Sequence, residues 1–229
     1  MCGRYSLASP PAKVRLSVPF TGDEALLQPR FNLAPTQAAA VVLASRELKL
    51  MRWGLAIPAG KRSATFLINA RSETASSKPA FKRLMAGQRC LILADGFYEW
   101  KKGGKTRQPY RFRLKTREPF AFAGVWGNCP GKEGRVEEGF VILTTQANSV
   151  VRPCHDRMPV ILGPEQCAAW LWPGNWPQSG PSASFFAPLG AEGMECYPVT
   201  PQLNDPRFEG PECFERWQGM AEPLEFDFG

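Results

Sequence analysis

The residue behind the initiator methionine, Cys2, has a type and a position that offer specific chemistry. If Met1 is removed, the chain begins with a cysteine that carries an α-amine and a thiol on adjacent carbons. The reference pKa values are about 7.7–8.0 for the amine and about 8.5 for the thiol, so both react near neutral pH. Such an aminothiol attacks an aldehyde through the amine and then closes a five-membered ring through the sulfur. A dispensable residue at a fraying terminus is the alternative interpretation.

Two further residues are candidates for proton transfer. His155, in CHDRMPVIL, is the only histidine, so any acid–base imidazole in this chain is this one, although a lone histidine is often structural. Glu99, in ADGFYEWKK, ends an apolar run, and strand alternation places it on the same face as Phe97. Apolar neighbours there would raise its pKa towards neutrality. The alternative is a solvent-exposed strand end paired with the lysines that follow.

Two other segments carry polar and charged side chains, one of them beside an aromatic ring. INARSET places Asn69, Arg71 and Glu73 at alternate positions, so an extended backbone points all three to one face. Arg52 and Trp53, in LMRWGL, combine a cation and a ring, which suits single-stranded nucleic acid because cations hold phosphates and rings stack on bases. A polar edge strand and an ordinary core tryptophan are the alternatives.

Short elements must position these residues, because 22 prolines and 21 glycines are spread along the chain. The clearest strands are predicted at 90–100, 110–114, 120–126 and 140–145, and KKGGKTRQ between the first two is typical of a hairpin loop. Helices are predicted at 77–87 and 163–172, each with a proline near its start. The predicted fold class is α+β, a strand-rich single domain over residues 1–229 with a few short peripheral helices.

Composition narrows the class of protein. The 229 residues carry a formal net charge of +7, which fits a polyanionic partner such as nucleic acid. No apolar run is long enough to cross a bilayer and the N-terminus does not read as a signal peptide, so we expect a cytoplasmic protein without membrane association. Seven scattered cysteines without a CxxC pair argue against a disulfide framework and a zinc site. We expect structural thiols, no metal and no cofactor.

The segments CGRY, RFNLAPTQ, MRWGL, INARSET, ADGFYEW and HDRMPVIL follow the order and rough spacing of the SRAP family, named for SOS response-associated peptidases. The resemblance covers residues 2–162, with a weaker continuation in YPVT that extends the motif-bearing part to 200 and leaves a tail at 201–229. It implies a curved or barrel-like mixed sheet and removal of Met1. It also implies that Cys2 reacts with the ring-opened aldehyde of an abasic site in single-stranded DNA, giving a thiazolidine DNA–protein crosslink.

The resemblance carries residue roles as well. It implies four catalytic residues, which are Cys2, Asn69, Glu99 and His155. It implies DNA contacts by Arg4, Arg71 and Arg157, to which we add Arg52 and Trp53. The chain departs from the family after WGL, where Ala59 and Gly60 stand in place of the common Ser-Trp pair.

Opening an abasic sugar requires proton transfer, which we assign to Glu99 and His155, with Asn69 orienting the amine or a sugar hydroxyl. A Schiff base acidifies the neighbouring carbon, so weak abasic-site lyase activity is expected. Two other functions stay open: a self-processing cysteine peptidase with Cys2 as nucleophile and His155 as base, and a passive single-strand binding module. We expect a monomer that associates with the nucleoid when bound to DNA.

Overall fold

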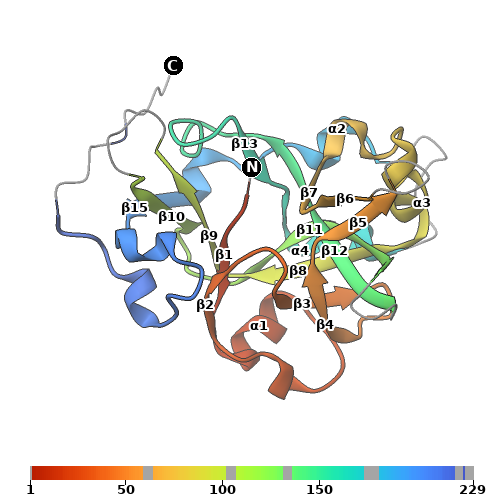
Figure 1. Cartoon of the computed structure of the whole chain (residues 1–229), viewed down its shortest axis with the longest axis horizontal. Helices are drawn as coiled ribbons and strands as arrows, with labels where there is room; N and C mark the ends of the chain where they lie inside the picture. Colours follow the sequence, from red (N-terminus) through yellow and green to blue (C-terminus); the bar gives the residue numbers. More distant parts are fainter. Residues whose placement is uncertain are drawn as a thin grey trace.

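The computed structural model describes residues 2–58, 64–101, 107–130, 136–172, 181–219 and 224 (Figure 1). Its strands are β1 (Tyr5–Leu7), β2 (Arg30–Leu33), β3 (Ala38–Leu43), β4 (Leu48–Trp53), β5 (Leu55–Pro58), β6 (Ala64–Leu67), β7 (Asn69–Arg71), β8 (Arg89–Ala94), β9 (Gly96–Trp100), β10 (Pro109–Leu114), β11 (Phe120–Pro130), β12 (Val136–Gln146), β13 (Arg157–Pro159), β14 (Ile161–Leu162) and β15 (Met194–Pro198). Its helices are α1 (Pro11–Ser17), α2 (Ser72–Ala75), α3 (Pro79–Gly87) and α4 (Pro164–Leu171). Short 3₁₀ turns include η5 (Pro201–Asn204) and η6 (Pro211–Phe214).

Five strands close into a barrel. Strand β12 pairs with β4, the order continues through β3, β8 and β11, and β11 pairs back with β12. The β12–β4 pairing is parallel and the others are antiparallel, so the sheet is mixed. A second, antiparallel sheet has the order β15-β10-β9-β1-β2. The prediction of a strand-rich α+β fold with a barrel-like mixed sheet is therefore confirmed.

The continuous apolar run at the start of the predicted 90–100 strand forms β8, which is buried on both faces. Alternation sends Cys90 and Ile92 to one core cluster, which also holds the rings of Trp53 and Phe122. It sends Leu91 and Leu93 to another cluster, which includes residues of α1, α3 and α4. The four predicted strands and both predicted helices are present, with a break in the first strand between β8 and β9.

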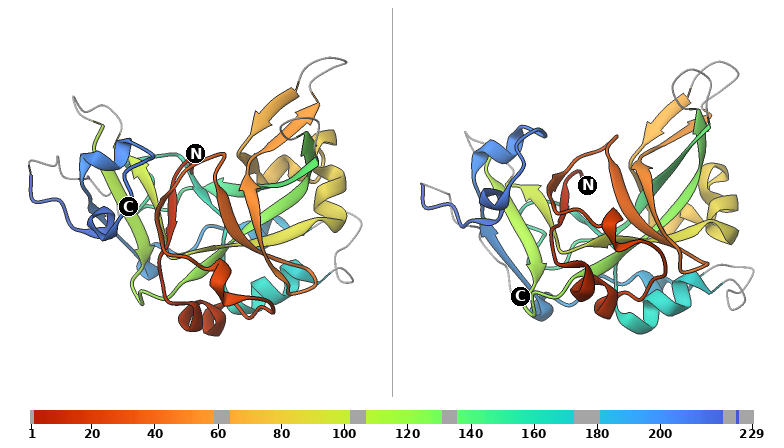
Figure 2. Two further views of the ribbon diagram at one scale, coloured as in Figure 1. Left: turned by 60° about the horizontal axis from the view of Figure 1, so that its bottom comes forward. Right: turned by 90° about the horizontal axis from the view of Figure 1, so that it is seen from below.

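Two hairpins bear on the site. Strands β9 and β10 pair antiparallel as predicted from KKGGKTRQ, although residues 102–106 of that segment lie outside the described residues. The β5–β6 hairpin extends away from the body of the molecule (Figure 2). It starts after Gly54, whose φ of +126° suits glycine, and a side chain there would collide with the ring of Phe66. Within the described part of the chain, no helix has the length and apolarity needed to cross a membrane.

Candidate active site

Strand pairing holds Cys2 next to the second sheet. Tyr5 of β1 lies opposite Phe97 of β9, and the Tyr98 backbone N–H extends the ladder by donating to the Arg4 carbonyl at 2.9 Å. Cys2, two residues further, is fully buried. The Asn69 Nδ2 donates to the Cys2 carbonyl at 2.8 Å, so two of the predicted catalytic residues are in direct contact. The other amide atom, Asn69 Oδ1, is buried without a hydrogen-bond partner among the described residues.

The Cys2 thiol is protonated at neutral pH in the chain that carries Met1. Burial raises the pKa of the thiol far above its ordinary value, and the negative charge of Glu99 raises it further. The Cys2 Sγ also lies 3.8 Å from the Arg4 carbonyl oxygen. Thiolate nucleophiles have lowered pKa values, so this sulfur requires a base before it attacks.

Glu99 occupies the buried face predicted for it. Its neighbour across the strand pair is Tyr110, whereas Phe97 lies opposite Phe112, and these four side chains share one face of the sheet. Glu99 is 4% exposed, so the interpretation of a solvent-exposed strand end is wrong. Its carboxylate lies close enough to Cys2 to influence the titration of the thiol.

His155 follows a residue that is packed in the same part of the core as Cys2. The preceding residue, Cys154, is buried in the same core cluster as Cys2. Burial raises the pKa of the Cys154 thiol to about 12, with smaller contributions from Cys196 and Glu99. Glu99 therefore lies close enough to the Cys2 thiol and to the Cys154 thiol to raise the pKa of both.

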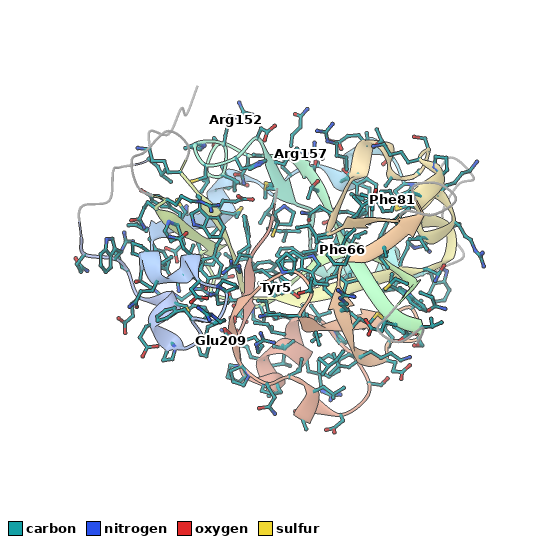
Figure 3. All side chains as sticks on the ribbon, in the orientation of Figure 1. Tyr5, Phe66, Phe81, Arg152, Arg157 and Glu209 are labelled. Carbon is teal, nitrogen blue, oxygen red and sulfur yellow. The ribbon has the colours of Figure 1, made fainter. Side chains whose placement is uncertain are left out.

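Strand β12 brings two of the predicted DNA-binding residues, Arg71 and Arg157, close together. It pairs with β7 so that Thr144 lies opposite Arg71, and with β13 so that Gln146 lies opposite Arg157. Arg71 and Arg157 accordingly line one cavity of about 540 Å³. Arg152 lines the same cavity and lies near Arg157 (Figure 3).

The extended backbone predicted for residues 69–73 ends early. Asn69 and Arg71 are in β7, but Glu73 is in helix α2, so the prediction that all three side chains follow strand alternation is wrong. The helix turns Glu73 towards Arg157, which donates to it through Nη1 at 2.5 Å and Nη2 at 2.7 Å. Arg157 also donates to the Thr144 carbonyl. Arg157 would therefore contact DNA, as predicted, while it is also bound to the Glu73 carboxylate.

The Glu73–Arg157 pair predicts a pH-dependent stability. The hydrogen bonds from Arg157 lower the pKa of Glu73, so the pair stabilises the fold above the unfolded-state pKa of about 4.3 and loses that contribution as the pH falls through the lower folded-state value. Because Glu73 is half-exposed, Glu73→Gln should cost only about 1 kcal/mol at pH 7. Urea unfolding at pH 7 and pH 3 should show this difference shrinking in acid, and an equal loss at both pH values would contradict it.

The prediction that Trp53 stacks on a DNA base is wrong. Its side chain is 0% exposed, and its Nε1 donates to the Ile68 carbonyl at 3.0 Å. The ring packs against Tyr5 and Phe140, at centroid distances of 5.0 and 6.4 Å. A cation does lie beside a ring in the sequence, but β4 turns the ring of Trp53 inwards while Arg52 stays on the surface.

The two other predicted DNA-binding arginines are partly engaged within the protein. Arg4 Nη1 donates to the Asn32 side chain at 2.7 Å and to the Leu203 carbonyl at 2.8 Å. Arg52 lies 3.4 Å from a carboxylate oxygen of Glu137, and its guanidinium lies 5.1 Å from the ring centre of Phe66. Phe66 is 40% exposed, and sequence analysis missed it because ATFLIN reads as an ordinary apolar strand.

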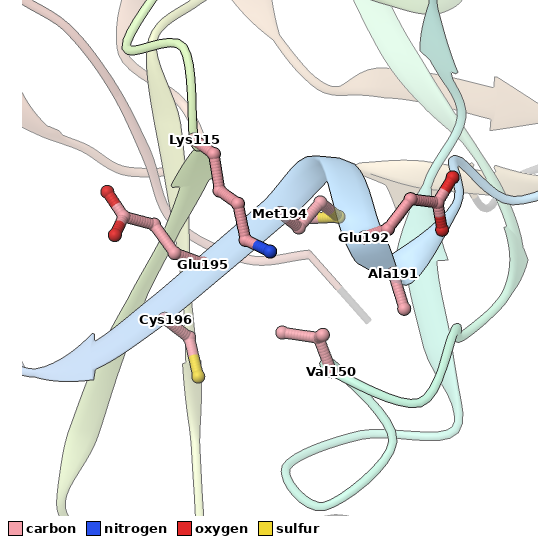
Figure 4. Close-up of a pocket in the computed structure, with 7 residues that line it drawn as sticks. All are labelled: Lys115, Val150, Ala191, Glu192, Met194, Glu195 and Cys196. Atoms are coloured by element: carbon pink, nitrogen blue, oxygen red, sulfur yellow. The ribbon is translucent and has the colours of Figure 1, made fainter. Parts of the chain in front are cut away.

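A second cavity, of about 440 Å³, lies elsewhere and contains none of the predicted site residues (Figure 4). It is lined by Lys115, Val150, Ala191, Glu192, Met194, Glu195 and Cys196. All seven cysteines are unpaired; besides Cys2, five are buried and Cys196 is partly exposed. Over the residues that the structure describes, no group of three or more His, Cys, Asp and Glu side chains could hold a metal ion.

Comparison with known proteins identifies the family to which the chain belongs. The model of the family described as SOS response associated peptidase (SRAP) matches residues 1–206. The chain is 36% identical over 225 residues to the abasic site processing protein YoqW of Bacillus subtilis, covering 94% of this chain and 99% of that protein. It is 30% identical over 230 residues to the abasic site processing protein YedK of Escherichia coli, with 94% and 99% covered. A crystal structure of a protein from Bacteroides thetaiotaomicron superposes with a TM-score of 0.80 at 26% identity, covering 94% of this chain and 100% of that one. This chain belongs to the SRAP family.

Proposed function

We propose that this protein captures abasic sites in single-stranded DNA covalently, through the aminothiol that Cys2 presents once Met1 is removed. The observation that carries the proposal is the hydrogen bond between Asn69 and the Cys2 carbonyl, made at a buried site beside Glu99. This hydrogen bond holds Cys2, the first residue of the mature chain, near Glu99, which can transfer a proton. The names of the similar proteins, which are abasic site processing proteins, support the same function.

The reaction follows from these groups. The amine of Cys2 adds to the C1′ aldehyde of the opened sugar, and loss of one water gives an imine. The thiol then adds to the imine carbon, its proton passes to the nitrogen, and a thiazolidine results. Because the thiol has a raised pKa, Glu99 acts as the base that takes the proton from sulfur. Asn69 Oδ1 is an open acceptor suited to the amine.

The imine also permits a slower side reaction. Its formation acidifies the hydrogen at C2′, so elimination of the 3′ phosphate competes with ring closure by the thiol. We therefore include weak lyase activity in the proposal. The thiazolidine ends this competition because it removes the imine.

Cysteine peptidase activity receives less support from the site. A peptidase that removes its own Met1 would use the Cys2 thiol alone, so the free α-amine that processing exposes would have no role. A passive binding module would leave the Cys2–Asn69 contact without a role. We rank both below covalent capture.

DNA binding in this proposal is electrostatic. The cavity of about 540 Å³ presents Arg71 and Arg152 beside the Glu73–Arg157 pair, and a few phosphate contacts of this kind make affinity fall steeply with salt. The lesion has no base to read, so binding should be indifferent to sequence. A cytoplasmic, nucleoid-associated monomer without membrane contact is part of the same proposal.

Phe66 takes over the base-stacking role that Trp53 cannot fill. It is half-exposed, lies next to Arg52 and precedes Asn69 by three residues, on the hairpin that projects from the barrel. Phe66→Ala should weaken binding of a single-stranded abasic oligonucleotide by about 1 kcal/mol or more, since stacking on one ring contributes about 1–3 kcal/mol. Fluorescence anisotropy measures this, with Leu50→Ala as the matched exposed apolar control. Equal effects of the two variants would contradict the assignment.

Intact mass spectrometry tests the proposed function. The purified protein should lack Met1, and incubation with an oligonucleotide that carries one abasic site should give protein plus DNA minus one water. Acetylation of the terminal amine should abolish this adduct, whereas it would spare proteolysis by the thiol. An adduct that survives acetylation, or none with the unmodified protein, would overturn the proposal.

A further inference from the structure

Two groups meet at one nitrogen of His155. The backbone N–H of Arg157 donates to Nδ1 at 2.9 Å, and Asp156 Oδ1 lies 2.8 Å from the same atom. The segment is held locally, because His155 N–H donates to the Val151 carbonyl at 3.0 Å and Ala147 N–H to the Asp156 carbonyl at 3.0 Å. Both neighbours of Nδ1 are thus fixed by the fold of this turn.

The two neighbours favour different protonation states. Nδ1 accepts a hydrogen bond only when it carries no proton, so the Arg157 N–H favours a neutral ring with its proton on Nε2. Nδ1 interacts favourably with a carboxylate only when it is protonated, so Asp156 favours the imidazolium. A neutral Nε2–H imidazole is a very weak acid, whereas the imidazolium is a proton donor suited to neutral pH.

Other charged groups lie around this segment. Glu73 is held by both terminal nitrogens of Arg157, so their charges largely cancel. The remaining charged groups that line the same cavity, or that influence the adjacent thiol of Cys154, are Arg71, Arg152, Glu99 and Lys101. Asp156 is in direct contact with the ring, because its Oδ1 lies 2.8 Å from Nδ1.

We propose that Asp156 is a positioning residue that makes His155 the proton donor for opening the abasic sugar, an inference that rests on the proposed function. The imidazolium gives its Nε2 proton to the ring oxygen O4′ while the C1′–O4′ bond breaks. The C1′ hydroxyl loses its proton to Glu99, and its electrons form the aldehyde C=O. His155 is left neutral with its remaining proton on Nδ1, facing Asp156. Without Asp156 that proton would lose its carboxylate and meet the N–H of Arg157.

The experiment uses the fact that the chain has a single histidine. In Asp156→Asn, the NMR titration midpoint of His155 should fall by about 0.5–1 pH unit, a modest shift because the Asp156 side chain is 75% exposed. The rate of crosslink formation depends on the protonated ring, so its decline at high pH should move down by the same amount. At a pH above both midpoints the rate should drop about three- to tenfold, the same shift expressed as a rate. Asp156→Glu, which keeps the charge, should restore both readouts most of the way.

Glu118→Gln is the matched control, because it removes an exposed carboxylate paired with Lys13 and should change neither readout. An unchanged midpoint in Asp156→Asn would overturn the inference, and so would a shifted midpoint with an unchanged pH–rate profile. If the wild-type protein forms no crosslink, the proposed function fails and the role of Asp156 fails with it. The titration then still reports separately whether Asp156 sets the protonation state of His155.

Discussion

Cys2→Ala is expected to abolish the heat-stable adduct with abasic DNA while leaving the protein folded. Alanine keeps the terminal amine but has no sulfur, so the reaction stops at an imine that water reverses. Cys2 is a small buried residue, and its truncation should cost only about 1 kcal/mol of folding free energy. Denaturing gel electrophoresis of an abasic oligonucleotide, read beside the urea unfolding curve, separates the two effects.

Cys2→Ser sharpens this test because it keeps a hydroxyl of similar shape. Its imine should be trapped by borohydride, and it should still cleave the DNA strand slowly through elimination of the 3′ phosphate. The wild type should cleave less, since its thiol removes the imine. A heat-stable adduct with Cys2→Ala, formed without borohydride, would show that another nucleophile does the chemistry.

Trp53→Ala is expected to destabilise the fold by about 3–5 kcal/mol, the range for truncating a large buried ring. The ring is fully buried, packs edge-on against Tyr5 and parallel to Phe140, and donates through Nε1 to the Ile68 carbonyl. Its removal leaves a cavity and takes the Trp53 hydrogen bond from the Ile68 carbonyl, which still accepts from the Ile142 backbone N–H. Urea unfolding should show a lower midpoint, with crosslinking reduced in proportion to the unfolded fraction.

Trp53→Phe is the conservative control, because it retains most of the apolar volume and loses the Nε1 hydrogen bond. It should lie between the wild type and Trp53→Ala in stability. Phe66→Ala, at a half-exposed ring, should by contrast change DNA binding more than stability. A stable Trp53→Ala protein with weakened DNA binding would mean that Trp53 contacts DNA after all.

Strand alternation explains why Glu99 was predictable from the sequence. A period of two residues fixes which side chains share a face, so the position of Glu99 on the same face as Phe97 follows from ADGFYEW alone. The same rule gave a wrong prediction for Glu73, because it assumed that the strand continues past Arg71. The backbone instead enters helix α2 after Arg71, and this difference gives Arg157 its carboxylate partner.

The sequence by itself determined the element types and the dominance of strands, because apolar periodicity and prolines are local properties of the chain. It also supplied the candidate reactive residues, through the order of its motifs. Only the tertiary structure decided which of those residues meet. Asn69 reaches the Cys2 carbonyl across 67 positions because β7 pairs in parallel with β12 beside the barrel. It also decided which ring faces solvent, since closure of the barrel buries Trp53 and leaves Phe66 half-exposed. Burial and long-range contact depend on how sheets close, and no local pattern encodes that.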